Sequence, residues 1–118
     1  MTDPATAATI PHESGDFSIG GSLWPGLSKL IEECGEVLQV GGKLIGSEGR
    51  TDHWSGDLNQ MLVDELGDLL AALRFFMEAN NIDTSSVAAR QRRKLAVFWE
   101  WHRQGLAVRA ILQEQSNG

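Results

Sequence analysis

The sequence predicts an all-α protein, an antiparallel bundle of three to four helices per chain that is completed by oligomerisation. Apolar residues recur about every 3.6 positions over three long segments, which is the pattern of amphipathic helices. No segment shows the alternating pattern that is typical of a strand. Three such helices also carry more apolar surface than a chain of 118 residues is expected to bury alone, which favours an oligomer.

The first helix is expected to begin at Leu27, where the apolar period starts. It should reach the region of Gly41 and Gly42, because glycine weakens a helix interior. Residues 45–57 follow, and they are rich in Gly, Ser and Asp. That composition predicts a loop between the first and second helices.

The second helix is expected to begin near Asp57 or Leu58 and to end around residues 79–83. A run of Asp, Thr and Ser at 83–86 offers N-caps for a third helix. Gly105 is expected to break that helix. These signals together predict that the chain has three parts. These are a disordered N-terminal tail at 1–21, a helical domain at 22–104, and a short C-terminal helix or tail at 105–118.

The amino-acid composition argues against several classes of function. A net charge of −6 argues against a surface that coats a nucleic-acid polymer, although the cluster ARQRRK at 89–94 suits a small anionic ligand. The single cysteine and three scattered histidines predict neither a disulfide framework nor a zinc site. The first residues lack the pattern of a signal peptide, and no segment has the length of a membrane span. We therefore expect a cytoplasmic protein.

Two segments, LIEECGEVL at 30–38 and LVDELGDLL at 62–70, repeat one pattern: Leu, β-branched, acid, Glu, any residue, Gly, acid, any residue, Leu. On a helical wheel of about 100° per residue, each acidic pair flanks its apolar stripe on the same side. Consecutive helices joined by a loop are usually antiparallel neighbours, which brings both pairs to one edge. The carboxylates expected to converge there are Glu33, Glu36, Glu65 and Asp68.

Four close carboxylates repel one another, and a divalent cation removes that cost. Ligands that are all oxygen favour Mg²⁺, with Mn²⁺ as the alternative. We therefore interpret the four acids as metal ligands and catalytic residues, and the sequence leaves open which of them orients an attacking water. The competing interpretation is a solvated acidic face. Gly35 and Gly67 stand beside the acids, where they allow either close approach of a backbone or ligand, or relief of crowding between the helices.

These motifs resemble the MazG-like branch of the all-α nucleoside triphosphate pyrophosphohydrolases. The family carries Glu-x-x-Glu, a spacer, and Glu-x-x-Asp, and the resemblance covers roughly residues 22–104. It implies Mg²⁺-dependent cleavage of a nucleoside triphosphate between the α- and β-phosphates, by a helical dimer or tetramer. Lys94 matches a lysine of the later helix, whereas Arg92 stands where members often carry an asparagine.

Six residues are secondary candidates for contacts to substrate: Lys29, Lys43, Arg90, Lys94, Trp24 and Trp54. The four cations are suited to neutralising phosphate charge. The alternative for Lys29, Arg90 and Lys94 is a helix-surface ion pair. The two tryptophans are suited to stacking on a base, and the alternative is an anchor in a core or interface. Two other functions stay open, namely a non-catalytic helical interaction module and a metal-dependent hydrolase of another phosphorylated metabolite.

Overall fold

The computed structural model describes residues 15–117, which are mostly helical. The elements are α2 (Leu27–Gly46), β1 (Asp52–His53), β2 (Gly56–Asp57), α3 (Leu58–Ala79) and α4 (Thr84–Asn117). They fall into two units, with the boundary between Ile82 and Asp83. The first unit contains α2, the hairpin and α3, and the second contains α4. The predicted boundary between 104 and 105 is therefore wrong, because it lies inside α4.

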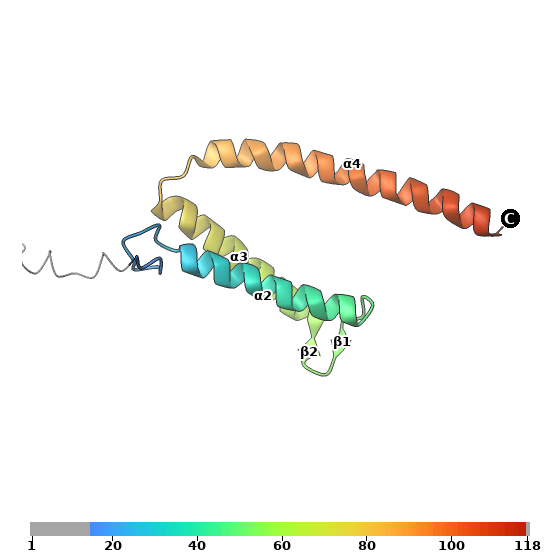
Figure 1. Ribbon diagram of the computed structural model, residues 1–118, viewed down its shortest axis with the longest axis horizontal. Coiled ribbons are helices and arrows are strands. Elements are labelled where there is room, and N and C mark those ends of the chain that lie inside the picture. Colours follow the sequence, from blue (N-terminus) through green and yellow to red (C-terminus); the bar gives the residue numbers. More distant parts are fainter. Residues whose placement is uncertain (1–14, 118) are drawn as a thin grey trace, which may run out of the picture. The chain divides into compact units, whose positions relative to one another are not determined.

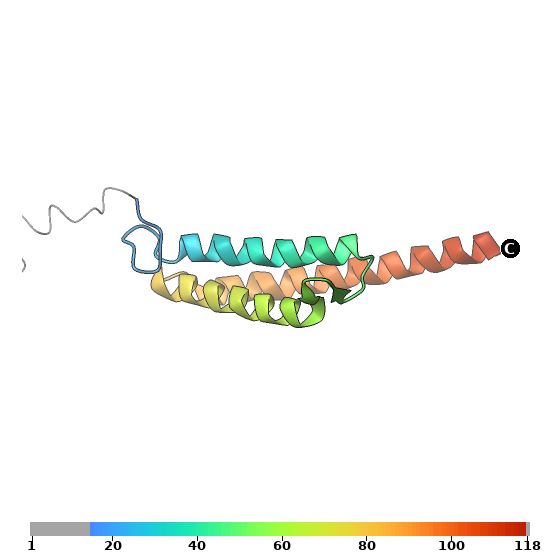
Figure 2. The same cartoon turned by 90° about the horizontal axis from the view of Figure 1, so that it is seen from below.

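The helices α2 and α3 pack side by side and run in opposite directions, as Figures 1 and 2 show. A hydrogen bond fixes this arrangement at one end, since the Asn80 side chain after α3 donates from Nδ2 to the Pro25 carbonyl before α2 at 2.9 Å. The aromatic rings of Trp24 and Phe76 stack at the same end. The antiparallel pair that the sequence predicted is thus present.

Residues 15–26 form a turn segment that is bonded to the start of α2. The Ser18 carbonyl accepts hydrogen bonds from the backbone N–H groups of Gly21 and Gly26, and the Phe17 carbonyl accepts one from Ser28. The part of the predicted disordered tail that falls on 15–21 is therefore wrong, because these residues make backbone hydrogen bonds. The rest of that prediction, on residues 1–14, lies outside the described part of the chain.

The first helix is longer than predicted, since it continues through Gly41 and Gly42 to Gly46. Val40 is buried, so apolar packing in this last part of the helix offsets the roughly 1 kcal/mol that each glycine costs. The expected loop is correspondingly shorter. It also contains the two-residue strands β1 and β2, which pair antiparallel and which the sequence did not predict.

The start of α3 agrees with its prediction. The Asp57 side chain caps the helix by accepting a hydrogen bond from the Asn59 backbone N–H at 3.0 Å. Leu58, the most deeply buried large side chain of the described residues, follows directly. Its backbone N–H donates to the Thr51 carbonyl, which anchors the hairpin to the first turn of α3.

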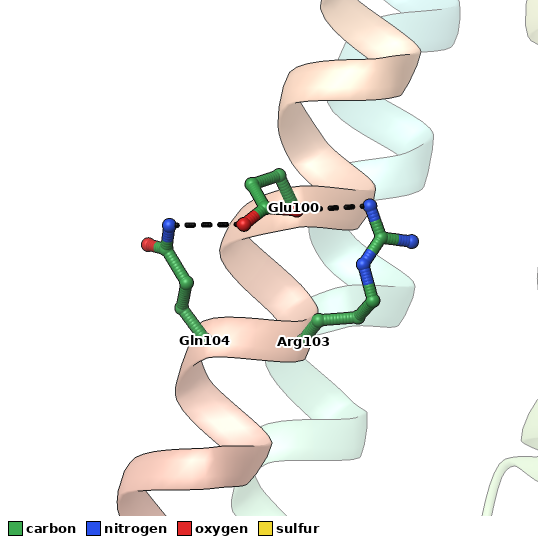
Figure 3. Close-up of polar contacts among 3 residues, drawn as sticks. All are labelled: Glu100, Arg103 and Gln104. Carbon is green, nitrogen blue, oxygen red and sulfur yellow. Dashed lines mark hydrogen bonds and ion pairs between the residues drawn. The ribbon is translucent and has the colours of Figure 1, made fainter.

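The third helix, α4, runs unbroken for 34 residues, so the break predicted at Gly105 is wrong. Asp83 caps its start, with hydrogen bonds from Ser85 and Ser86 that lower the pKa of the Asp83 carboxyl to about 2. Near Gly105, Glu100 accepts hydrogen bonds from Arg103 and Gln104 on the next turn (Figure 3). These bonds join side chains of the helical turn that directly precedes Gly105.

Few side chains are buried. The buried apolar residues among those described are Val40, Leu58 and Ala72. Large apolar side chains on α2 and α3 stay exposed, including Leu38 at 75%, Ile45 at 82% and Leu70 at 67%. None of the described helices is both long and apolar enough to cross a bilayer.

Candidate metal centre

Three of the four predicted acids lie together on the facing helices of the first unit. Glu33 on α2, and Glu65 and Asp68 on α3, each offer a carboxylate oxygen, and these oxygens all lie within 4.8 Å of one another. Glu33 and Glu65 are half-buried and Asp68 is exposed. The helical spacing explains the meeting, because i and i+3 share one helix face and the helices run antiparallel.

Glu36, the fourth predicted acid, does not belong to this close group of carboxylates. It is half-buried one turn after Glu33 on α2. Its negative charge nevertheless acts on Glu65, so it lies in the surroundings of the cluster.

The cluster perturbs the ionisation of Glu65. Partial burial raises the pKa of the Glu65 carboxyl above its ordinary value, and the negative charges of Glu36, Asp68, Glu33 and Asp64 raise it further. Both effects disfavour the charged form. A positive charge placed among the acids would remove this penalty, so the donor set fits a hard divalent cation.

Lys29, one turn before Glu33, bridges two acids of its own helix. Its Nζ lies 3.1 Å from Glu32 Oε2 and 4.0 Å from Glu33 Oε1. The hydrogen bond and charge of Glu32 raise the pKa of Lys29, with smaller contributions from Glu33 and Asp68. The predicted ion pair is therefore present, although Glu32 is its closer partner.

A hollow with a volume of about 400 Å³ opens beside the carboxylates. Lys29, Glu33 and Asp68 form its polar part. Ile19, Ala71, Ala72 and Phe75 form its apolar part. Ile19 was not among the predicted site residues, because the composition of residues 1–21 predicted a disordered tail. The pattern Phe17-Ser18-Ile19 before two glycines was the available signal.

The two glycines beside the acids are not required by the packing of α2 on α3. A Cβ atom added at Gly35 or at Gly67 would meet nothing within 4 Å among the described residues. Relief of crowding between these two helices is therefore the wrong explanation. Close approach of a ligand or of another chain stays a prediction for both positions.

The other predicted contact residues lie elsewhere. Trp24 stacks on Phe76 with ring centroids 6.1 Å apart. Lys43 and Trp54 lie at the far end of α2 and in the hairpin. Arg90 is exposed on α4, and Lys94 places its Nζ 5.7 Å from the centre of the Phe98 ring on the same helix. Of the six candidate residues, Lys29 alone lines the hollow beside the acids.

The chain matches no protein-family model, no curated protein and no solved structure. The geometry and chemistry of the carboxylate site therefore carry the functional proposal.

Proposed function

We propose that the protein is a Mg²⁺-dependent nucleoside triphosphate pyrophosphohydrolase of the MazG-like type. It would cleave a ribo- or deoxyribonucleoside triphosphate between the α- and β-phosphates. The observation that carries the proposal is the meeting of Glu33, Glu65 and Asp68 from two antiparallel helices within 4.8 Å. Carboxylates held together in this way, with no histidine or cysteine among them, suit a hard cation that also binds phosphate oxygens.

Each residue then has a role. Glu33, Glu65 and Asp68 hold the cation, which when bound offsets phosphate charge and lowers the pKa of a nearby water. Lys29 donates from Nζ to a phosphate oxygen at the edge of the hollow. Glu36, outside the close group, accepts the proton of the attacking water.

The reaction balances as a hydrolysis. Water attacks the α-phosphorus in line with the leaving group, and the bond from that phosphorus to the α–β bridging oxygen breaks. Pyrophosphate leaves with the bridging oxygen, and the nucleoside monophosphate keeps the oxygen of water. The water proton passes to the Glu36 carboxylate and then to solvent.

The direct test is a turnover assay. The protein is incubated with Mg²⁺ or Mn²⁺ and a panel of ribo- and deoxyribonucleotides, and monophosphate and pyrophosphate are quantified. Glu65→Ala should abolish turnover while circular dichroism shows unchanged helical content. Asp64→Asn is the matched control, because Asp64 is exposed next to Glu65 and bonds to Gln60 at 2.8 Å. Metal binding with pyrophosphate from none of the nucleotides would favour a hydrolase of another phosphorylated metabolite instead.

We further propose that the chain acts as a homo-oligomer, a dimer or tetramer. The support is the apolar surface of α2 and α3, which leaves Leu38, Ile45 and Leu70 largely exposed. Burial of apolar surface stabilises association by about 25 cal/mol per Å² before association costs are subtracted. The helix α4 adds Leu95, Phe98 and Trp99, which line a shallow hollow of their own.

The same exposed residues favour the second candidate function, a non-catalytic helical interaction module. Under that alternative the acids are solvated surface groups. It predicts no metal-dependent change in melting temperature and no turnover of any nucleotide. The thermal and turnover measurements therefore separate the two functions.

A further inference from the structure

The β-hairpin follows the end of α2 in the first unit (Figures 1 and 2). A second hollow is lined by residues of both. Its volume is about 390 Å³, and its lining includes Lys43, Ser47, Arg50, Asp52, His53 and Trp54. None of these residues lines the hollow beside the carboxylates. Lys43 is seven positions after Glu36, which is about 10 Å along the helix at 1.5 Å per residue.

Hydrogen bonds hold this hollow in shape. His53 Nδ1 accepts a hydrogen bond from the Ser55 backbone N–H at 3.1 Å, and Ser55 Oγ lies 2.7 Å from the same nitrogen. Because Nδ1 accepts, the neutral ring carries its proton on Nε2, which stays available as a donor. Lys43 Nζ donates to Ser55 Oγ at 3.4 Å and thereby joins α2 to the hairpin.

The charge of the hollow differs from that of the whole chain, which is −6. Lys43 and Arg50 contribute two positive charges, against the single carboxylate of Asp52. Within residues 15–117, neither cation forms a salt bridge. Ammonium and guanidinium groups without a carboxylate partner are suited to binding phosphate.

Trp54 supplies a different kind of contact. Its side chain is 91% exposed at the turn of the hairpin, and its ring centre lies 5.2 Å from that of His53. An exposed indole offers a flat face on which a base stacks. The Asp52 carboxylate, with acceptor oxygens only, is suited to the hydroxyl groups of a sugar.

We propose that Lys43, Arg50, Asp52, His53 and Trp54 form a second binding site, specific for a mononucleotide and independent of metal. Lys43, Arg50 and His53 Nε2 bind the phosphate, Asp52 binds the ribose hydroxyls, and Trp54 stacks on the base. The sequence hypothesis placed Lys43 and Trp54 in the substrate site, whereas this proposal assigns them to a site of their own. It does not depend on the proposed hydrolysis.

The test is isothermal titration calorimetry of the full chain with a nucleoside monophosphate in the presence of a chelator. We expect binding without metal, with affinity lowered at least about tenfold by Arg50→Ala and by Lys43→Ala, since charged hydrogen bonds are lost. Trp54→Ala should also weaken binding, and Trp54→Phe should restore part of it. Inorganic phosphate should bind more weakly than the monophosphate, and the free nucleoside should bind weakest.

Two controls locate the site. Arg74→Ala removes an exposed arginine that pairs with Glu78 on α3, and it should leave binding unchanged. Glu65→Gln alters the carboxylate cluster and should also leave binding unchanged. Absence of binding in chelator, or binding that survives both Arg50→Ala and Trp54→Ala, would overturn the proposal. Loss of binding in Glu65→Gln would also overturn it, because the ligand would then occupy the carboxylate site.

Discussion

Glu33 on α2 and Glu65 on α3 lie across the antiparallel helix pair with carboxylate oxygens within 4.8 Å of each other and of Asp68. A cation bound there would stabilise the folded chain, because it binds the native state in preference to the unfolded one. We expect Mg²⁺ and Mn²⁺ to raise the melting temperature. At a metal concentration of 100 times the dissociation constant, the gain is about 2.7 kcal/mol.

Differential scanning fluorimetry across a metal titration measures this effect. Glu65→Gln should remove most of the metal-dependent shift, whereas Asp64→Asn should retain it. A melting temperature of the native sequence that stays constant up to millimolar metal would contradict the proposed centre.

The raised pKa of Glu65 makes a second prediction, on pH. The folded state keeps the Glu65 proton to a higher pH than the unfolded state, whose carboxyl titrates near 4.5. Stability contributed by this group is therefore complete below that value and is lost as pH rises through the folded pKa. The glutamine side chain of the Glu65→Gln variant cannot ionise. In chelator, the free energy of unfolding of the variant relative to the native sequence should therefore increase as the pH rises from about 4.5 through the folded pKa of Glu65, and should then level off.

Urea unfolding at several pH values measures that difference. Other groups also change the stability with pH. The lowered pKa of Asp83, for example, makes the stability fall as the pH decreases. Both proteins carry these groups, so their effect cancels when the two free energies of unfolding are subtracted. Added Mg²⁺ should abolish the advantage of the variant. A variant that is less stable than the native sequence at neutral pH in chelator would refute the account of repelling carboxylates.

A third prediction concerns the turn that begins α2. Gly26 has φ 89°, and a Cβ atom there would lie 2.7 Å from the Phe75 ring. Gly26→Ala should destabilise the chain by about 1–3 kcal/mol through backbone strain and overlap. Gly35→Ala is the matched control, because it lies inside α2 with open space around it, and it should stabilise by roughly 0.5–1 kcal/mol. Chemical denaturation measures both changes.

The opposite result for Gly35→Ala, a lower free energy of unfolding, would reveal a contact at this position. Since the Cβ meets nothing within the described chain, the loss would show that another chain or a ligand approaches Gly35 closely. An unchanged stability of Gly26→Ala would contradict the strained turn.

Local signals predicted the elements that local interactions fix. Asp57 was expected to start α3, and its side chain caps the helix within the same turn. The convergence of Glu33, Glu65 and Asp68 was likewise predictable, because helical spacing and an antiparallel hairpin together determine which side chains meet.

Non-local or distributed effects decided the features that the sequence analysis missed. Gly42 lies inside α2, where packing of a neighbour such as Val40 offsets the cost of a glycine. Gly105 lies inside α4, because one glycine costs only roughly 1 kcal/mol and the residues on both sides of it continue the helix. The two-residue hairpin has no alternating pattern to detect, since it depends on the Leu58 N–H reaching the Thr51 carbonyl. Ile19 reaches the hollow through backbone hydrogen bonds of the segment 15–26 that composition does not reveal.

The exposed apolar residues of α2 and α3 support the last prediction, on assembly. Leu38 is 75% exposed and Leu70 is 67% exposed. Light scattering after size exclusion should give at least twice the mass of one chain. Leu38→Glu and Leu70→Glu should each weaken association by at least about a hundredfold, because a symmetric interface buries the new charge on both copies.

Gln39→Glu is the matched control. Gln39 is exposed beside Leu38, so the variant adds the same charge and should leave the mass unchanged. A folded protein with the mass of a single chain at micromolar concentration would contradict the proposed oligomer, because the fold would then be stable with these apolar side chains exposed to water.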